Sequence, residues 1–143
     1  MVLTPSSVSE QTTIDFQPSG SGLHLHIAAG IAILPWGNVP VTKGNWTSAT
    51  VEFEILKGKV VSGQPGFVGE GSPSKVSVQA YPLTFDVTQD IGQTGGFGWG
   101  VDDASYRINP SQGSLTMVIT VVAKSAYSEV LRIGYQAVVM GLL

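Results

Sequence analysis

Residues 46–56 read WTSATVEFEIL, and this stretch predicts the fold class of the chain. Its apolar residues Val51, Phe53 and Ile55 alternate with polar ones. Because successive side chains of a strand point to opposite faces of a sheet, the alternation predicts a strand with one buried face and one solvated face.

Similar strand-forming stretches lie on both sides of residues 46–56. Residues 23–34, 115–123 and 130–139 are rich in valine, isoleucine and other apolar residues, and segments rich in glycine and proline separate them. Turn signals recur at intervals of roughly 8–12 residues, a spacing typical of sandwiches and barrels. The chain is therefore predicted to be all-β, either an antiparallel β-sandwich or jelly-roll-like fold or a β-barrel, with about 8–10 short strands.

Two residues predict departures from regular strands. Gly30 lies inside the strand predicted over residues 23–34, where a glycine marks a bend, a bulge or a close approach of another backbone. Pro82 separates the strands predicted over residues 75–81 and 83–87. Because proline lacks a backbone N–H, it indicates an edge strand or a bend between sheets.

Length and composition indicate a single domain. The chain has 143 residues, of which 43% are hydrophobic and 12% charged, and it contains no cysteine. Residues 1–11 are polar and lack periodicity, so we expect an extended N-terminal arm that is either free or ordered by a partner. Residues 12–143 are expected to form one all-β domain.

The charge and hydropathy patterns argue against nucleic acid and membranes as partners. The net charge is −3, and the seven lysines and arginines are scattered singly, so no basic patch is present. The longest apolar run, residues 27–34, is far shorter than the roughly 20 residues of a membrane span. Since the N-terminus also lacks the features of a secretory signal, we expect a soluble protein made in the cytoplasm.

Two histidines form the first candidate metal site. His24 and His26 share one face of a strand, where two imidazoles are able to chelate one metal ion. The chain has no third histidine, and residues 28–34 contain no glutamate. Both histidines are therefore expected to be polar residues on a solvated or interface face.

Carboxylate pairs form the other candidate catalytic and metal sites. Glu52 and Glu54 lie two residues apart on a strand, but the solvation expected there leaves neither with the raised pKa that acid catalysis needs. Asp102 and Asp103 lack the D-x-D-x-D-G spacing of a calcium loop, so we expect them to cap a turn. No enzymatic activity, metal or cofactor is predicted.

Large aromatic residues offer a second type of site. Residues 94–100 read TGGFGWG and lack the strand-to-helix context of a phosphate-binding loop. Aromatic rings that stack on sugars, beside carboxylates that accept hydrogen bonds, make a carbohydrate-binding module or the receptor-binding tip of a phage fibre the alternative function. Its residues are Trp36, Trp46, Phe97, Trp99, Asp102 and Asp103. The other interpretation is that the aromatic residues close one end of the sandwich or a subunit interface.

Several features favour a protein that works by contact with other proteins. The charged share of 12% is about half the usual share of roughly 25%, as expected when copies of a chain bury much of their surface against one another. Residues 62–74 are rich in glycine and proline and form a long loop of a kind that is often functional. The predicted partner contacts are Leu3, Pro5 and Val8 in the arm and Phe67 and Val68 in the loop.

In its length, its composition, its polar N-terminal arm and its loop at residues 62–74, the chain resembles the small all-β head decoration proteins of tailed bacteriophages. The resemblance covers the whole chain and contains no diagnostic motif, so it carries over no site residues. It implies a homotrimer in the virion that contacts the major capsid protein or another virion protein. The predicted function is therefore that of a non-enzymatic structural protein that decorates and stabilises a viral capsid.

Overall fold

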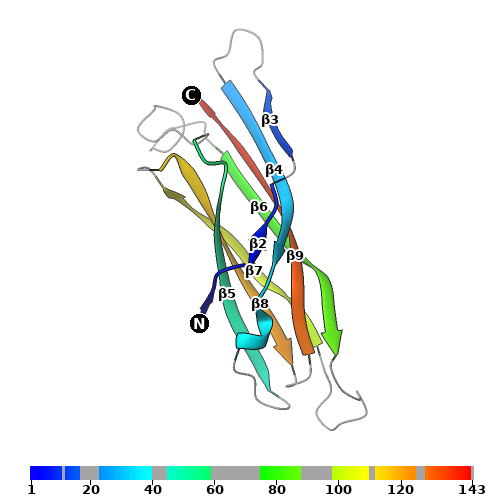
Figure 1. Cartoon of the computed structure of the whole chain (residues 1–143). Helices are drawn as coiled ribbons and strands as arrows, with labels where there is room; N and C mark the ends of the chain where they lie inside the picture. The colour runs from blue at the N-terminus through cyan, green and yellow to red at the C-terminus, as the bar shows by residue number, and fades with distance from the viewer. Residues whose placement is uncertain are drawn as a thin grey trace.

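The computed structural model describes residues 1–10, 12–16, 23–39, 45–58, 75–87, 98–109, 112–124 and 128–142. These residues form nine strands and one short 3-10 helix (Figure 1). The helix spans Trp36–Asn38, and the strands are β1 (Val2–Leu3), β2 (Ser7–Val8), β3 (Thr12–Phe16), β4 (Leu23–Ile33), β5 (Trp46–Ile55), β6 (Lys75–Val87), β7 (Gly98–Asn109), β8 (Ser114–Lys124) and β9 (Ser128–Leu142). The all-β prediction is confirmed.

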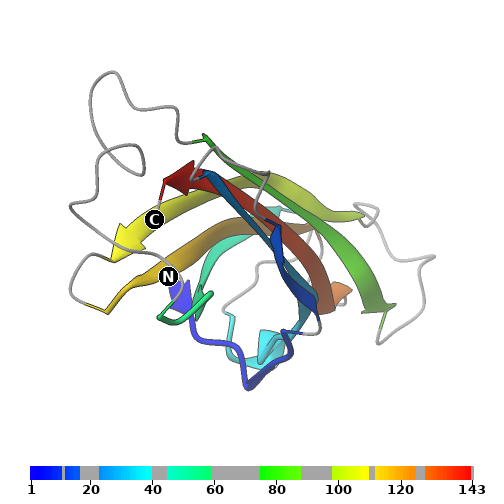
Figure 2. The same cartoon turned by 90° about the horizontal axis from the view of Figure 1, so that it is seen from above.

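The strands form two sheets that pack face to face. Sheet A has four strands in the order β1-β5-β8-β7, and sheet B has five, in the order β2-β4-β9-β6 with β3 also paired to β4. All paired strands are antiparallel except β1 and β5, which are parallel. Figure 2 shows the same two sheets from above. Over the described ranges no strand ladder joins the layers into a barrel, so the sandwich alternative is the one observed.

The core lies between the two sheets and follows the alternation seen in the sequence. β5 turns Val51, Phe53 and Ile55 inward, and each is at most 8% exposed. The ring of Phe53 meets that of Tyr135 from β9 edge to face, with 4.9 Å between the ring centroids. The quadrupoles of aromatic rings favour this geometry. Burial of side chains of this size contributes roughly 1.5–3 kcal/mol each to the free energy of unfolding.

Some strands are longer than the sequence predicted. β6 is one strand of 13 residues that runs through Pro82, where two strands were expected. It tolerates the proline because it is the outer strand of sheet B, and its register against β9 shifts on either side of Thr84. Of the two alternatives that Pro82 indicated, an edge strand and a bend between sheets, the edge strand is the one observed.

β7 also begins earlier than the short strand that the sequence predicts over residues 106–108. Its first residue is Gly98, and a Cβ there would come within 2.7 Å of Cη2 of Trp46. The absence of a side chain at Gly98 thus lets the ring of Trp46 lie against the start of β7. The sequence pattern missed this part of the strand because its glycines resemble those of a loop.

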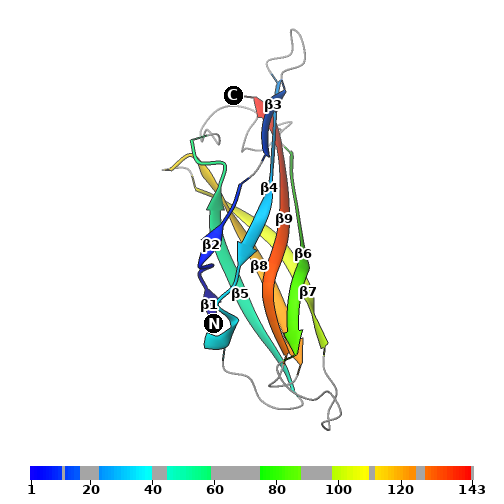
Figure 3. The same ribbon diagram turned by 45° about the vertical axis from the view of Figure 1, so that its right-hand side comes forward.

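The first ten residues, called here the N-terminal strap (residues 1–10), cross from one sheet to the other (Figure 3). β1 pairs with β5 of sheet A, and β2 pairs with β4 of sheet B. The segment is extended, as predicted, but it is not free. Its backbone N–H and C=O groups form hydrogen bonds with β4 and β5 of the same chain. These backbone groups therefore do not need a partner protein to satisfy them.

Ser9 is held closely in this strap. Its N–H donates to the carbonyl of Ile31 at 2.9 Å, and its Oγ accepts the N–H of Ile31 at 3.0 Å. The hydroxyl of Tyr135 donates to the carbonyl of Ser9 at 2.6 Å. A Cβ at Gly30 would collide with that same carbonyl. Because the register of β4 against β9 is continuous at Gly30, the glycine serves a close approach and not a bulge.

Glu10 fixes the far end of the strap. Its Oε2 accepts the backbone N–H of Leu56 at 3.0 Å. Leu56 has a φ of 54°, in the left-handed region that costs an L-residue about 1–2 kcal/mol, and its side chain is fully buried. The carboxylate therefore satisfies the backbone of a strained residue at the end of β5.

The hydroxyl of Tyr135 predicts a loss of stability in alkaline solution. Burial raises the pKa of Tyr135 well above its usual value, and the charge of Glu10 adds to the rise. A group whose pKa is raised on folding stabilises the fold fully below its unfolded pKa, near 10 for tyrosine, and this contribution is lost as the pH rises further. We expect the midpoint of thermal unfolding to fall between pH 9.5 and 11.5 less steeply for Tyr135→Phe than for the wild type.

Tyr106→Phe, at a tyrosine that is 41% exposed, is the matched control. It should follow the wild-type profile. An identical pH dependence in the wild type and Tyr135→Phe would contradict the prediction.

Candidate functional site

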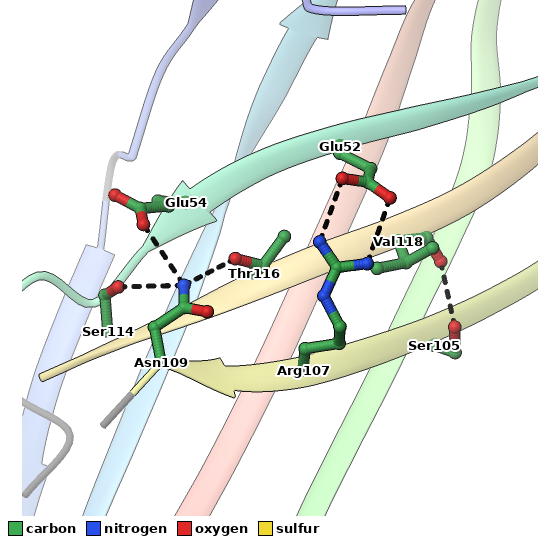
Figure 4. Close-up of polar contacts among 8 residues, drawn as sticks. All are labelled: Glu52, Glu54, Ser105, Arg107, Asn109, Ser114, Thr116 and Val118. Atoms are coloured by element: carbon green, nitrogen blue, oxygen red, sulfur yellow. Dashed lines mark hydrogen bonds and ion pairs between the residues drawn. The ribbon is translucent and has the colours of Figure 1, made fainter. Parts of the chain in front are cut away.

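The outer face of sheet A is polar, and its side chains bond to one another (Figure 4). Arg107 of β7 reaches across β8 and donates two hydrogen bonds to Glu52 of β5, at 3.0 and 2.9 Å. These bonds hold the pKa of Glu52 below its usual value and raise that of Arg107. Both groups face solvent, so the pair orders this face more than it stabilises the fold.

Asn109 lies at the end of the same face. Its Nδ2 approaches three acceptors: Oγ1 of Thr116 at 2.6 Å, Oε1 of Glu54 at 3.1 Å and Oγ of Ser114 at 3.2 Å. Ser114 is fully buried and Thr116 is 6% exposed. The amide therefore satisfies hydroxyl groups that the strands have withdrawn from water.

Replacement of Asn109 by leucine is expected to destabilise the fold by about 1–3 kcal/mol, since it leaves buried hydroxyl groups without their donor. Urea unfolding at neutral pH measures the change. Arg107→Leu, on the same strand and the same face, is the control and should have the smaller effect because its partner remains solvated. Equal effects of the two variants would contradict the burial argument.

The outer face of sheet B differs, because β4 places its large side chains outward. Its inward positions hold small residues, Ala28 and Ala32, and both are fully buried. Its outward positions, which alternate with these, hold Ala29 and four large aliphatic residues: Leu25, Ile27, Ile31 and Ile33. In a two-layer sandwich the larger apolar side chains are expected on the inner face. β4 thus places side chains that usually form a core on the outer face, where Leu25, Ile27 and Ile31 are half-buried and Ile33 is exposed.

The neighbouring strands extend this apolar surface. Val138 of β9 is paired with Ile27, and Tyr81 of β6 lies over Gly134, where an added Cβ would collide with its ring. Tyr81 is 49% exposed and Ile33 is 37% exposed. We call these outward apolar residues the sheet B face: Leu25, Ile27, Ile31, Ile33, Tyr81 and Val138. The polar side chains described among them are Ser77, Gln79, Arg132 and Gln136.

An open groove of about 410 Å³ lies between β6 and β7, the outer strands of the two sheets. Gln79, Ala80 and Tyr81 line it from β6, and residues 101–104 line it from β7. The register of β7 shifts between Val101 and Asp103, as at a β-bulge. The groove therefore brings together two residues of the carbohydrate alternative, Asp102 and Asp103, and both are exposed.

The aromatic residues of that alternative do not join them. Trp36 is 2% exposed and belongs to the core, so its predicted use as a stacking surface is wrong. Trp46 is 58% exposed on the outer face of sheet A, whereas Trp99 pairs with the buried Ala123 and packs against the core. Phe97 lies outside the described residues.

The predicted partner contacts are also dispersed. Leu3 is 5% exposed and part of the core, so it is not available to a partner. Pro5 is half-buried, and Val8 is 36% exposed. Phe67 and Val68 lie outside the described residues.

His26 contradicts the prediction for the histidine pair. It pairs with Val139 on the inward side of sheet B and is 2% exposed, not solvated. The position of the His24 side chain lies outside the described part. Where the structure is described, no three residues of the types His, Cys, Asp and Glu come together as metal ligands would.

The sheet B face is the candidate site that the sequence did not predict. Its signal is present in residues 23–34, where large apolar residues alternate with alanine, glycine and histidine. The continuous apolar run at residues 27–34 instead indicated a buried strand. Among the described residues, no helix is long and apolar enough to cross a membrane. Comparison with protein-family models, curated proteins and solved structures found no match.

Proposed function

We propose that the chain is a non-enzymatic structural protein that acts through contact with other proteins of an assembly. The observation that carries this proposal is the difference between the two outer faces of the sandwich. The face of sheet A is mostly polar, with Trp46 exposed at one end, and its polar side chains bond to one another. The sheet B face instead carries a run of large aliphatic side chains that are half-buried or exposed. Burial of such surface contributes roughly 25 cal/mol per Å², so a protein partner has much to gain there.

The assembly that we propose is a viral particle, with the chain as a decoration protein on its capsid. The low charged share of 12% and the small all-β sandwich support this assignment, together with the resemblance of the sequence to phage head decoration proteins. Such a protein stabilises a shell by adding buried area where subunits meet. The partners are then copies of the chain and the major capsid protein or another virion protein.

The test is the protein content of purified particles. Particles banded on a density gradient from cells that encode the chain are expected to contain it in a fixed ratio to the major shell protein, by quantitative mass spectrometry. Chain carrying Ile31→Lys, on the sheet B face, should be lost from these particles.

Val122→Lys is the matched control, because Val122 is an aliphatic residue on the outer side of sheet A. Chain with this change should be retained. Recovery of the wild-type chain only in the soluble fraction would overturn the proposal.

A further inference from the structure

The sheet B face has the properties of a surface that binds its own copy. We propose that the sheet B faces of two chains pack against each other in a symmetric dimer. The dimer rests on the proposed function in one respect: both assign a protein partner to the sheet B face. The inference names that partner as a second copy of the chain, in a dimer that takes the place of the homotrimer implied by the sequence resemblance.

The size of the face fits a stable dimer. Strands β3, β4, β9 and β6 lie side by side, and β4 pairs with β9 over all eleven of its residues. With strands about 4.8 Å apart and a rise of about 3.3 Å per residue, β4, β9 and β6 cover about 14 by 36 Å, and the five residues of β3 bring the surface to roughly 600 Å². Specific interfaces of standard size bury about 600–1,000 Å² of each partner, so the face reaches the lower end of this range.

The polar groups on the face suit contact with an identical surface. Gln136 lies near the middle of β9, between Ala29 of β4 and Gln79 of β6. Both glutamines are exposed. An amide carries donors and an acceptor, so it is able to bond to its own copy across a twofold axis.

The charge on the face is also compatible with self-association. Arg132 is the one charged side chain among those described on this face, and it lies four residues from Gln136 along β9. With the twofold axis near Gln136 and perpendicular to β9 in the plane of the interface, the two copies of Arg132 would be roughly 25 Å apart. That distance exceeds the Debye length of about 8 Å at physiological salt, so their repulsion is screened.

The outer face of sheet A explains why the sheet B face of one chain should pack on the sheet B face of the second chain and not on its sheet A. A head-to-tail stack would press the sheet B face of one chain onto the ion pair of Arg107 with Glu52. Burial of that pair carries a desolvation penalty that its attraction does not reliably offset. Face-to-face packing keeps both polar faces in water and closes the assembly at two copies.

Light scattering on the full-length chain tests the proposal. The wild type is expected at twice the chain mass of 15.0 kDa, at concentrations of about 10–100 µM. Gln136→Glu should weaken dimerisation at least about tenfold at pH 7, because it opposes two carboxylates at the axis. It changes one exposed amide to a carboxylate of the same shape, so the fold should persist, and circular dichroism checks this.

Val122→Lys is again the control and should remain a dimer. A monomeric wild type, a trimer, or a dimer that Gln136→Glu leaves intact would each overturn the proposal. A wild-type monomer whose Ile31→Lys variant is still lost from particles would refute the dimer alone and leave the proposed function standing. The wild-type chain could instead be absent from particles and still form a dimer that Gln136→Glu weakens. That result would refute the proposed function and leave the dimer standing.

Discussion

Removal of residues 1–10 is expected to lower the free energy of unfolding by about 5 kcal/mol or more, which is enough to unfold a domain of ordinary stability. The deletion removes the buried side chain of Leu3, and loss of a core leucine costs about 2–5 kcal/mol. It also removes the hydrogen bonds that Ser9 makes with Ile31 and Tyr135, at roughly 0.5–1.5 kcal/mol each. Finally, it leaves the N–H of Leu56 without the carboxylate of Glu10.

Two point variants separate core burial from mere shortening of the chain. Leu3→Ala should cost about 2–5 kcal/mol, whereas Val2→Ala, at a neighbouring residue that is 61% exposed, should change stability by less than about 0.5 kcal/mol. Urea unfolding followed by circular dichroism measures both. A deletion variant that unfolds at the wild-type urea concentration would show that the strap does not support the fold.

Gly30→Ala is expected to cost about 2–4 kcal/mol, an unusually large effect for the addition of one methyl group. The new Cβ would overlap the backbone carbonyl of Ser9 and come within 2.9 Å of the hydroxyl of Tyr135. Because the nearest obstacle is backbone, the strap must move away and lose the hydrogen bond between Tyr135 and Ser9.

Gly37→Ala is the matched control, since a Cβ at Gly37 has no atom within 4 Å. Its effect should stay below about 0.5 kcal/mol. Amide exchange adds a local readout, because the N–H of Ser9 should lose protection in Gly30→Ala. Equal stability of the two variants would contradict the close approach at Gly30.

The elements that the sequence predicted well are those with a strong local pattern. The alternation of residues 46–56 located β5 to within one residue, and the edge strand that Pro82 indicated as one of two alternatives is observed. The strap escaped prediction because two-residue strands have no detectable period. Their stability comes from free edges of β4 and β5, which lie far along the chain.

The candidate site was predicted only in part, for a related reason. Asp102 and Asp103 do line a groove, but the other side of the groove comes from β6, which pairs with β9 and not with β7. The sheet B face was missed because hydrophobicity alone does not distinguish the two faces of β4. The register against β9 and the burial of each side chain show that Ala28 and Ala32 face the core, whereas Ile31 and Ile33 lie on the outer face.

The bond between Ser9 and Tyr135 joins residues that are 126 positions apart, and this separation has a consequence for biosynthesis. Residues 1–10 leave the ribosome before the strands on which they will lie. At about 5–20 residues per second, roughly 6–25 s pass between the synthesis of Ser9 and that of Tyr135. During this interval the nascent chain carries β4, apolar on both sides, without its neighbour β9. Until β9 has been made, the apolar side chains of β4 lack their partner strand, and the nascent chain is most prone to aggregation at this stage.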